Sequence, residues 1–305
     1  METIFETLKS LFNSENEFFT LARKGKRITH IALAIPLLIV FFIAGFFVSE
    51  FVIYQFVLLP LGITGAFKAF YTLTLSFGFV TFFLWLWVSF FEKRSFRTLG
   101  LTKNGAFKKY ITGFLIGFIM LSIVIGLMAI FGILGIRENV EPFSFNFLGI
   151  MFLLLLGYVI QGATEEIIAR GWQFQVIGAR YRPWLGAVIS SVIFALLHGL
   201  NTGVSVLAII NLLLFALMLI LFILYNQSIW TACGWHTAWN WAMENIYGLK
   251  VSGTEGFGSI LNLSAQGPNY LTGGEFGPEG SILTTFVLLG GMLTAILFKA
   301  KEKNK

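Results

Sequence analysis

Charged residues are scarce in this sequence: Asp, Glu, Lys and Arg together make up 12% of its 305 residues. Ordinary globular domains carry about 25% charged residues, so the composition excludes a soluble globular protein. Asp is absent altogether, and every acidic residue is a Glu. The one cysteine, Cys233, cannot form an internal disulfide, which excludes a disulfide-stabilised secreted domain.

Apolar residues take the place of the missing charge, at 57% of the chain, and the mean hydropathy is +0.83. Six windows contain no Lys, Arg, Asp or Glu: 31–49, 69–91, 110–136, 142–164, 183–243 and 280–298. A membrane-spanning helix needs about 20 mostly apolar residues. Five windows fit one span each and 183–243 fits three, so we predict an all-α polytopic membrane protein with about eight transmembrane helices.

The positive charges are unevenly distributed along the chain. Eighteen of the 21 Lys and Arg residues lie in four segments: 1–30, 92–109, 170–182 and 299–305. With eight spans these four segments share one side of the membrane, and the positive-inside rule places that side, with both termini, in the cytoplasm. The net charge of +6 thus reflects membrane topology, and we expect no nucleic-acid partner.

The predicted organisation is an amphipathic cytoplasmic segment over 1–30, a single transmembrane domain over 31–298 and a basic cytoplasmic tail over 299–305. Aromatic and aliphatic residues alternate with Glu and Lys in the first segment, as in a helix lying on a membrane surface; they include Phe5, Leu8, Leu11, Phe12, Phe18 and Phe19. Pro60 and two glycines interrupt the apolar stretch 51–66, for which we expect a re-entrant or interfacial segment.

A few polar residues interrupt the spans. A charged side chain at the centre of a bilayer costs roughly 2.5–3.5 kcal/mol on insertion scales, and by default it marks a functional site. The polar residues are Glu165, Glu166, Arg170, His198, His236, Asn240 and Glu244. We expect the last of these to lie at a helix end and to reach the outer water.

The spacing of these residues predicts a site. Glu166 and Arg170 are four residues apart on one helix face, so they can form an ion pair. Glu165 is turned about 100° from Glu166 and is left to face another partner. His236 and Asn240 have the same four-residue spacing, as do Phe194 and His198. Because lipid-facing placement is too costly, we expect spans 4, 5 and 7 to meet around a small polar cavity.

Depth in the membrane places a condition on this site. Glu165 lies 15 residues before Arg180, and His198 lies 16 residues after Arg182. Both are then roughly 22–24 Å from the turn between their helices, so they can face each other. This requires the fourth helix to continue through Arg170 to about residue 179, and part of the hairpin to protrude into the cytoplasm.

Such a cluster suits hydrolysis. A carboxylate and an imidazole that share a water molecule can remove a proton from it, and general-base catalysis is worth roughly 10²–10⁴ in rate. His236 and the Asn240 amide can donate hydrogen bonds to the oxyanion that forms on the attacked carbonyl. The alternative is a zinc ion held by Glu165, His198 and His236, although the helical His-x-x-x-His pair of many zinc proteases is missing.

Three stretches resemble the ordered motifs of the CAAX protease and bacteriocin-processing (CPBP) family of intramembrane proteases, also called the ABI family. The motifs are Glu-Glu-x3-Arg, Phe-x3-His and His-x3-Asn/Asp. They match Glu165 to Arg170, Phe194 to His198 and His236 to Asn240. The resemblance covers about 160–245, and 97–101 is similar to the loop that follows an early helix in that family.

The resemblance implies a membrane endopeptidase with its site near the cytoplasmic side, in which 31–298 is the protease domain. Eukaryotic relatives remove the last three residues of prenylated CAAX proteins. On that analogy Glu165 activates water with His198, while His236 and Asn240 form the oxyanion hole. Glu166 with Arg170 maintains the site, and Phe194 supports it. We expect no required cofactor, with zinc as the alternative.

The resemblance further implies a bacterial plasma membrane as the location, and membrane lipids and a peptide or protein substrate, lipidated or not, as partners. Two other functions stay open. The chain could be a non-catalytic bacteriocin-immunity or scaffold member of the same fold, or a proton-coupled transporter with a Glu/His relay. A transporter predicts inverted repeats or broken helices in paired positions, and the sequence contains no such repeat.

Overall fold

The uncharged windows form long helices in the computed structural model, which describes residues 2–137 and 144–303. The helical elements in chain order are α1 Glu2–Leu11, α2 Glu17–Thr20, η1 Ala22–Lys24, α3 Ile31–Phe46, η2 Phe47–Leu58, α4 Gly65–Tyr71, η3 Thr72–Ser76, α5 Phe77–Leu86, η4 Trp87–Glu92, η5 Phe96–Leu99, α6 Ala106–Ile130, α7 Phe145–Glu166, η6 Ile167–Phe174, α8 Gln175–Arg180, α9 Pro183–His198, α10 Val206–Asn226, α11 Trp230–Trp241, η7 Ala242–Ile246, α12 Asn269–Thr272, η8 Gly274–Phe276, η9 Pro278–Gly280 and α13 Ile282–Lys303. Two short strands, β1 Leu134–Ile136 and β2 Leu263–Ala265, pair antiparallel with Leu134 opposite Ala265.

Six helices of the described part are long and apolar enough to cross a membrane: Ile31–Leu58, Gly65–Glu92, Ala106–Ile130, Phe145–Arg180, Val206–Asn226 and Ile282–Glu302. Two shorter helices, α9 and α11 with its extension η7, pack among them. The chain is therefore an all-α polytopic membrane protein, as its composition predicts. The number of eight spans stays a prediction, since α9 has only 16 residues.

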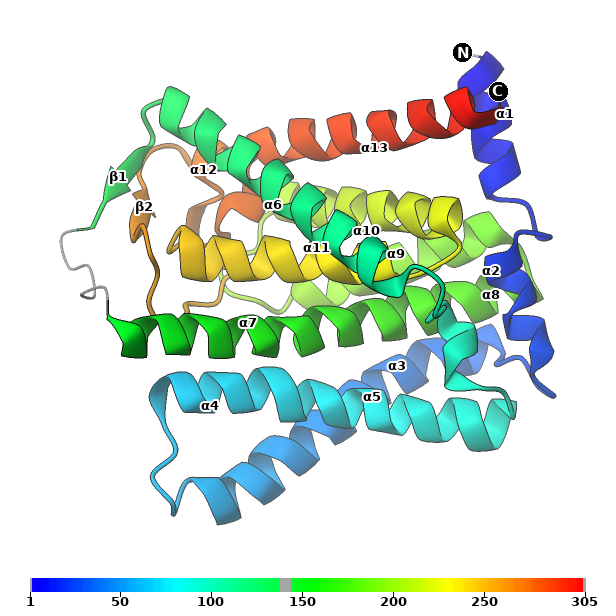
Figure 1. Cartoon of the computed structure of the whole chain (residues 1–305), viewed down its shortest axis with the longest axis horizontal. Helices are drawn as coiled ribbons and strands as arrows, with labels where there is room; N and C mark the ends of the chain where they lie inside the picture. The colour runs from blue at the N-terminus through cyan, green and yellow to red at the C-terminus, as the bar shows by residue number, and fades with distance from the viewer. Residues whose placement is uncertain (1, 138–143, 304–305) are drawn as a thin grey trace.

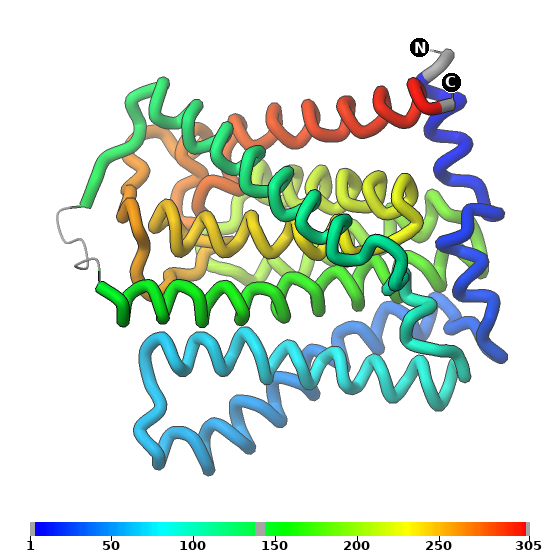
Figure 2. Tube along the Cα trace, in the orientation of Figure 1, coloured from blue at the N-terminus to red at the C-terminus, as the bar shows by residue number. Residues whose placement is uncertain are grey.

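Helices α7, α10 and α11 run side by side along the long axis of the molecule (Figure 1). The α3 and α4–α5 segments flank them on one side and α13 on the other, while α6 runs obliquely across α11 (Figure 1). Both ends of the described chain lie at one end of the bundle, and α1 crosses that end (Figure 2). The β1–β2 pair lies at the opposite end (Figure 1). Helix α10 is buried on all faces from Met218 to Leu224, as expected for a helix that is apolar all round.

The fourth long helix is continuous from Phe145 to Arg180 through α7, η6 and α8, which confirms the predicted extension past Arg170. Its 36 residues extend about 54 Å, well beyond the roughly 30 Å hydrocarbon core of a bilayer. The expected re-entrant segment over 51–66 is wrong in its first half, because the helix that begins at Ile31 continues to Leu58. The interruption comes only at residues 59–64, around Pro60.

The N-terminal segment packs on the extended end of this helix. The Phe18 and Phe19 rings are fully buried, and their centroids lie 5.6 and 5.2 Å from that of Phe174. The Gln175 amide donates to the Phe18 carbonyl at 2.7 Å. The expectation of a membrane-surface helix is therefore wrong for these two rings, although Phe5 stays exposed.

At the other terminus α13 continues to Lys303, and residues 304 and 305 of the predicted tail lie outside the described residues.

A buried polar network joins the end of the second long helix to the same extended end. The Glu92 carboxylate accepts from Arg94 at 2.6 Å and from the Trp172 indole at 3.0 Å. Arg94 also donates to Gln175 at 2.7 Å and to Thr98 at 3.1 Å, which secures the η5 loop. These hydrogen bonds satisfy the buried Glu92 and Arg94 charges and connect the two helices at this end of the bundle.

Close packing between α6 and α11 fixes the helix that carries His236. Gly113 and Gly117 are four residues apart on α6. A Cβ atom on them would lie 2.0 Å from the Thr231 carbonyl oxygen and 2.5 Å from the Trp235 carbonyl oxygen, respectively. Gly234 on α11 makes the reciprocal approach to the Tyr110 carbonyl. Small residues at this spacing let transmembrane helices come into backbone contact.

We predict that Gly117→Leu lowers the thermal unfolding temperature and the yield of monodisperse protein in detergent, because its side chain must displace α11. Gly126→Leu is the matched control, since a Cβ atom on Gly126 meets no atom within 4 Å. Unfolding curves measured by tryptophan fluorescence check this. Equal unfolding temperatures for the two variants would show that the close approach does not support the fold.

Candidate active site

The two adjacent glutamates lie on the long helix at the point where its backbone widens. Glu165 and Glu166 end the α-helical part, and a π-type helix follows over Ile167–Phe174. Such widenings occur often at functional sites, because they turn side chains away from the regular helical positions. Glu166 is fully buried and Glu165 is 9% exposed. Neither carboxylate faces lipid.

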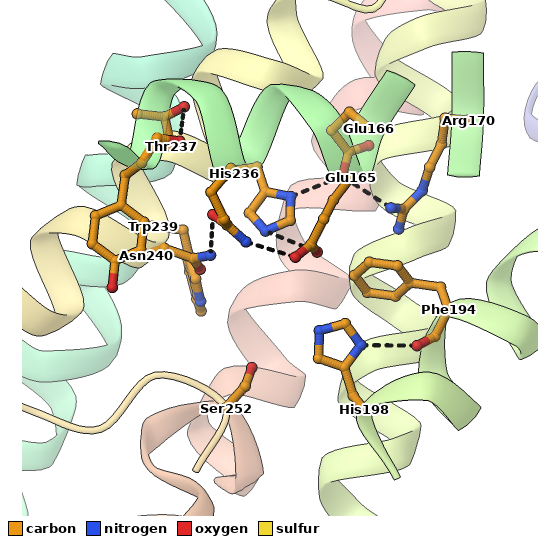
Figure 3. Close-up of polar contacts among 12 residues, drawn as sticks. Glu165, Glu166, Arg170, Phe194, His198, His236, Thr237, Trp239, Asn240 and Ser252 are labelled. Carbon is orange, nitrogen blue, oxygen red and sulfur yellow. Dashed lines mark hydrogen bonds and ion pairs between the residues drawn. The ribbon is translucent and has the colours of Figure 1, made fainter. Parts of the chain in front are cut away.

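Glu166 forms the centre of a buried charge cluster. Its Oε1 accepts from Arg170 Nη1 at 2.9 Å, which is the predicted ion pair between residues four apart. The same oxygen lies 2.9 Å from His236 Nδ1 on α11. A carboxylate can only accept here, so Nδ1 carries the hydrogen. Glu166 thus links the long helix to α11 and sets the orientation of the His236 ring (Figure 3).

Two aromatic rings cover the Arg170 guanidinium. The guanidinium carbon lies 4.0 Å from the centroid of Phe194 on α9 and 5.6 Å from that of Phe215 on α10. Ring faces carry partial negative charge and stabilise a desolvated cation. Phe194 therefore does more than fill space: it connects the charge cluster to the helix that carries His198.

Glu165 has no arginine or lysine partner within residues 2–137 and 144–303. Its Oε1 accepts from the Gln161 amide at 2.6 Å, and the Gln161 carbonyl oxygen in turn accepts from Asn240 Nδ2 at 3.2 Å. Its other oxygen, Oε2, lies 3.7 Å from His236 Nε2 and has no hydrogen-bond partner among the described protein atoms. Oε2 of Glu166 is likewise buried without a partner among the described residues, so the two carboxylates differ in exposure and in their pairing with Arg170.

A cavity of about 460 Å³ opens beside Glu165. Polar side chains from three helices line it, namely Glu165 and Gln161 from α7, His198 from α9 and Asn240 from α11. His198 lies on the side of this space opposite Asn240, and Ser252 bounds it from the loop after η7 (Figure 3). The rest of the wall is mainly apolar and includes Phe42, Phe46 and Phe77. The predicted meeting of the fourth, fifth and seventh spans is thus found in the structure.

The cavity does not bring all the predicted residues into direct contact. His198 Nδ1 lies 2.9 Å from the Phe194 carbonyl oxygen of its own helix and makes no hydrogen bond to Glu165. Because that carbonyl only accepts, Nδ1 carries the hydrogen and Nε2 of the neutral ring is an acceptor. His236 is closer to the two glutamates than the sequence suggests.

Sequence reasoning missed Gln161 and Glu279. Gln161 lies four residues before Glu165, a spacing that would have placed it on the same face. Glu279 lies in the glycine-rich loop that precedes α13, and it is only 6% exposed. It accepts from Trp239 Nε1 at 3.2 Å and from the Ser252 backbone N–H and hydroxyl at 2.6 Å each. No local pattern signals these contacts between distant segments.

Glu244 corrects another expectation. It is 8% exposed and does not reach outer water, because its carboxylate accepts a hydrogen bond from the Tyr158 hydroxyl. Asn245 also donates to it, at 3.4 Å. This hydrogen bond joins η7 to α7. Tyr158 itself lines the active-site cavity, so Glu244 lies directly behind one of the cavity's wall residues.

The alternative zinc set does not fit this arrangement. Three ligands around one ion must lie within about 2.0–2.2 Å of it. Across residues 2–137 and 144–303, no three His, Cys, Asp or Glu side chains are gathered closely enough to hold a metal. Glu165 and His198 line the cavity and His236 lies beside Glu165, but the three side chains do not converge on one point.

One comparison with known proteins finds a similarity, in the central part of the chain. Residues 147–242 match the family model described as type II CAAX prenyl endopeptidase, Rce1-like. The match includes all seven predicted site residues: Glu165, Glu166, Arg170, Phe194, His198, His236 and Asn240. It supports a CAAX-type membrane protease at the level of the family. No curated protein and no solved structure matches the chain.

We predict that Glu166→Gln destabilises the fold much more than Glu165→Gln does. Removing one partner of a buried ion pair typically costs about 3–5 kcal/mol, since Arg170 keeps its charge without a carboxylate. Glu165→Gln removes no arginine partner, so its cost is expected to be about 1 kcal/mol. Thermal unfolding in detergent measures both variants. A similar drop in unfolding temperature for both variants would mean that the Glu166–Arg170 ion pair does not stabilise the site.

Proposed function

We propose that this chain, whose residues 147–242 match the Rce1-like type II CAAX prenyl endopeptidase model, is an intramembrane endopeptidase that uses water activated by Glu165. One observation carries the proposal: Glu165 lines a cavity without an arginine or lysine partner among the described residues, while its neighbour Glu166 is fully buried and pairs with Arg170. A carboxylate in this position is suited to act as a general base.

In the proposed reaction a water molecule bound to the Glu165 carboxylate attacks the carbonyl carbon of the scissile peptide bond. Its proton passes to Glu165 as the new C–O bond forms. The tetrahedral intermediate then collapses, the C–N bond breaks, and Glu165 returns the proton to the leaving amine. His198 faces the same cavity, and its Nε2 accepts a hydrogen bond from the water because Nδ1–H is held by the Phe194 carbonyl.

Two donors are proposed for the oxyanion. The Asn240 amide uses one N–H on Gln161, and its second N–H is available to the substrate. His236 donates from Nε2 only as the imidazolium, since Nδ1–H is directed at Glu166. One such donor is typically worth about 10²–10³ in rate.

The cleaved bond is proposed to lie near the cytoplasmic leaflet. Glu165 lies 15 residues, or about 22 Å, from Arg180 along the long helix. The N-terminal segment and the Glu92 network cover the Arg180 end, which supports placing the excess helix length outside the hydrocarbon on that side. The lysine and arginine distribution supports the cytoplasm as that side, with both termini there.

The substrate is proposed to be a peptide or protein segment with an apolar or lipidated residue near the cleaved bond. Phe42, Phe46 and Phe77 form an apolar wall next to the polar residues of the cavity, a combination suited to such a ligand. The bacteriocin-immunity or scaffold alternative lacks catalysis, and the transporter alternative moves protons without cleaving a peptide. Peptide cleavage by the purified protein separates the proposed enzyme from both alternatives.

We predict that Glu165→Gln lowers peptide cleavage by about 10²–10⁴, because the amide cannot accept the water proton. Cleavage of a fluorogenic peptide by protein purified in detergent measures the effect, with the unfolding temperature recorded in parallel. Glu255→Gln, at an exposed loop glutamate 74% open to solvent, is the control and retains full activity. Undiminished cleavage by Glu165→Gln would refute the general-base role, and no cleavage by the unmodified protein would favour the non-catalytic alternatives.

We predict that Gln161→Leu lowers kcat by about 10- to 100-fold with little change in KM, since Glu165 and Asn240 lose the amide that positions both. Gln173→Leu is the matched control, because Gln173 is a buried glutamine of the same long helix that donates to the Ala34 carbonyl at 3.2 Å. It is expected to lower stability and leave kcat of the folded enzyme unchanged. A loss for Gln161→Leu that appears only in KM would contradict a positioning role.

We further propose that the reaction needs no metal ion. Treatment with a chelator, followed by metal analysis of the purified protein, is expected to leave cleavage unchanged with less than one metal ion per chain. Loss of activity on chelation, with recovery on addition of zinc but not magnesium, would make the glutamate-only mechanism wrong.

A further inference from the structure

A second cavity, of about 820 Å³, lies between α6 and α13 on the flank away from the active site. Its walls are mainly apolar, with Ile116 and Ile123 from α6 and Val287 and Phe298 from α13, and Phe222 of α10 lies at its floor. None of its lining residues lines the active-site cavity. Helices α6 and α13 diverge toward the end of the bundle where the termini lie (Figure 1). We call this space the α6–α13 groove.

The groove opens to the surroundings of the protein along its length. Ile123 is 48% exposed and Phe298 is 62% exposed, so both walls present apolar side chains outward. Both residues belong to helices that are long and apolar enough to span a membrane. In a bilayer the groove is therefore accessible to lipid hydrocarbon.

One end of the groove is basic. Lys108 and Lys109, in the first turn of α6, line this end. The Lys109 ammonium donates to the Asn226 carbonyl at 3.0 Å, which holds it at the groove. Lys108 is exposed, and no ion pair joins either lysine to an acidic side chain among the described residues. A positive charge at the end of an apolar groove fits a ligand with an anionic head and a hydrocarbon tail.

The length of the groove fits a lipid with its head group. Lys108 and Ile123 are 15 residues apart on α6, a distance of about 22 Å, and one leaflet contributes about 15 Å of hydrocarbon. The groove is therefore long enough for an acyl chain along its apolar walls and an anionic head group at its basic end.

Two adjacent glycines on α13 shape the groove. A Cβ atom on Gly291 would lie 2.7 Å from the Met120 methyl carbon, so this glycine permits packing between the helices. A Cβ atom on Gly290 would meet no atom within 4 Å, although Gly290 lines the groove. The open space at Gly290 is thus part of the volume available to a ligand.

We propose that the α6–α13 groove binds one anionic phospholipid of the bilayer. Its phosphate pairs with Lys108 next to the Lys109 ammonium, and an acyl chain lies along the apolar walls past Gly290. Basic pockets between transmembrane helices are a common form of anionic-lipid recognition. The bound lipid bridges α6, which packs against α11, and α13, so it is expected to stabilise the bundle without entering the active site.

Native mass spectrometry of the full-length protein, released from detergent with dioleoyl phosphatidylglycerol or dioleoyl phosphatidylcholine, tests the proposal. The unmodified protein is expected to retain one phosphatidylglycerol in preference to phosphatidylcholine. Lys108→Gln is expected to reduce that preference about fivefold, the effect of one favourable lysine–headgroup contact. Lys301→Gln is the charge-matched control, an exposed lysine of α13 that does not line the groove, and it should retain the preference.

Gly290→Leu tests the acyl-chain site separately, because a leucine there fills the groove. It is expected to abolish retention of phosphatidylglycerol, whereas Gly149→Leu, at a glycine of α7 that also has open space, leaves it unchanged. Equal retention of the two lipids by the unmodified protein would overturn the proposal. So would full retention by Gly290→Leu, or an equal loss for Lys108→Gln and Lys301→Gln, which would indicate general surface attraction only.

Discussion

The burial of Arg170 within a membrane bundle is the constraint on which the site depends. A charge in this environment must be balanced inside the protein, and here Glu166 supplies the carboxylate while Phe194 and Phe215 cover the guanidinium. Because Glu166 also bonds to His236, the same balance determines how α11 lies against the long helix. Because Glu166 neutralises Arg170, the adjacent Glu165 lies next to the cavity without an arginine or lysine partner among the described residues. Two neighbouring residues of one type thus have different partners because their surroundings differ.

The fold maintains this arrangement through contacts some distance from the chemistry. Gly113 and Gly117 let α6 press against α11, so that His236 and Asn240 stay level with the glutamates. At the other end of the cavity, Glu279 ties Trp239 of α11 to Ser252 of the following loop. These contacts come from helices and loops that are far apart in the sequence. A membrane bundle lacks a hydrophobic driving force between its helices, so close packing and buried hydrogen bonds specify the geometry.

Much of this could be predicted from the sequence. Runs without charge are physically required of membrane helices, so they predict the fold class, and the four-residue spacing of Glu166 and Arg170 predicts their ion pair. The matched depths of Glu165 and His198 predict a long fourth helix, which the structure contains. The partners of Gln161 and Glu279 could not be predicted, because they depend on which helix faces which. The burial of Phe18 and Phe19 was missed for the same reason: an amphipathic pattern shows an apolar face and does not show whether lipid or protein covers it.

The proposed enzyme hydrolyses a peptide bond in the cavity beside Glu165. An experimental structure of the Glu165→Gln variant in lipid, bound to an uncleaved peptide substrate, is the sharpest test. We expect the scissile carbonyl to lie in the cavity between residue 165 and His198, within one water molecule of residue 165, with its oxygen directed at Asn240. A peptide bound elsewhere, or a carbonyl that cannot be reached from residue 165 through a single water molecule, would contradict it.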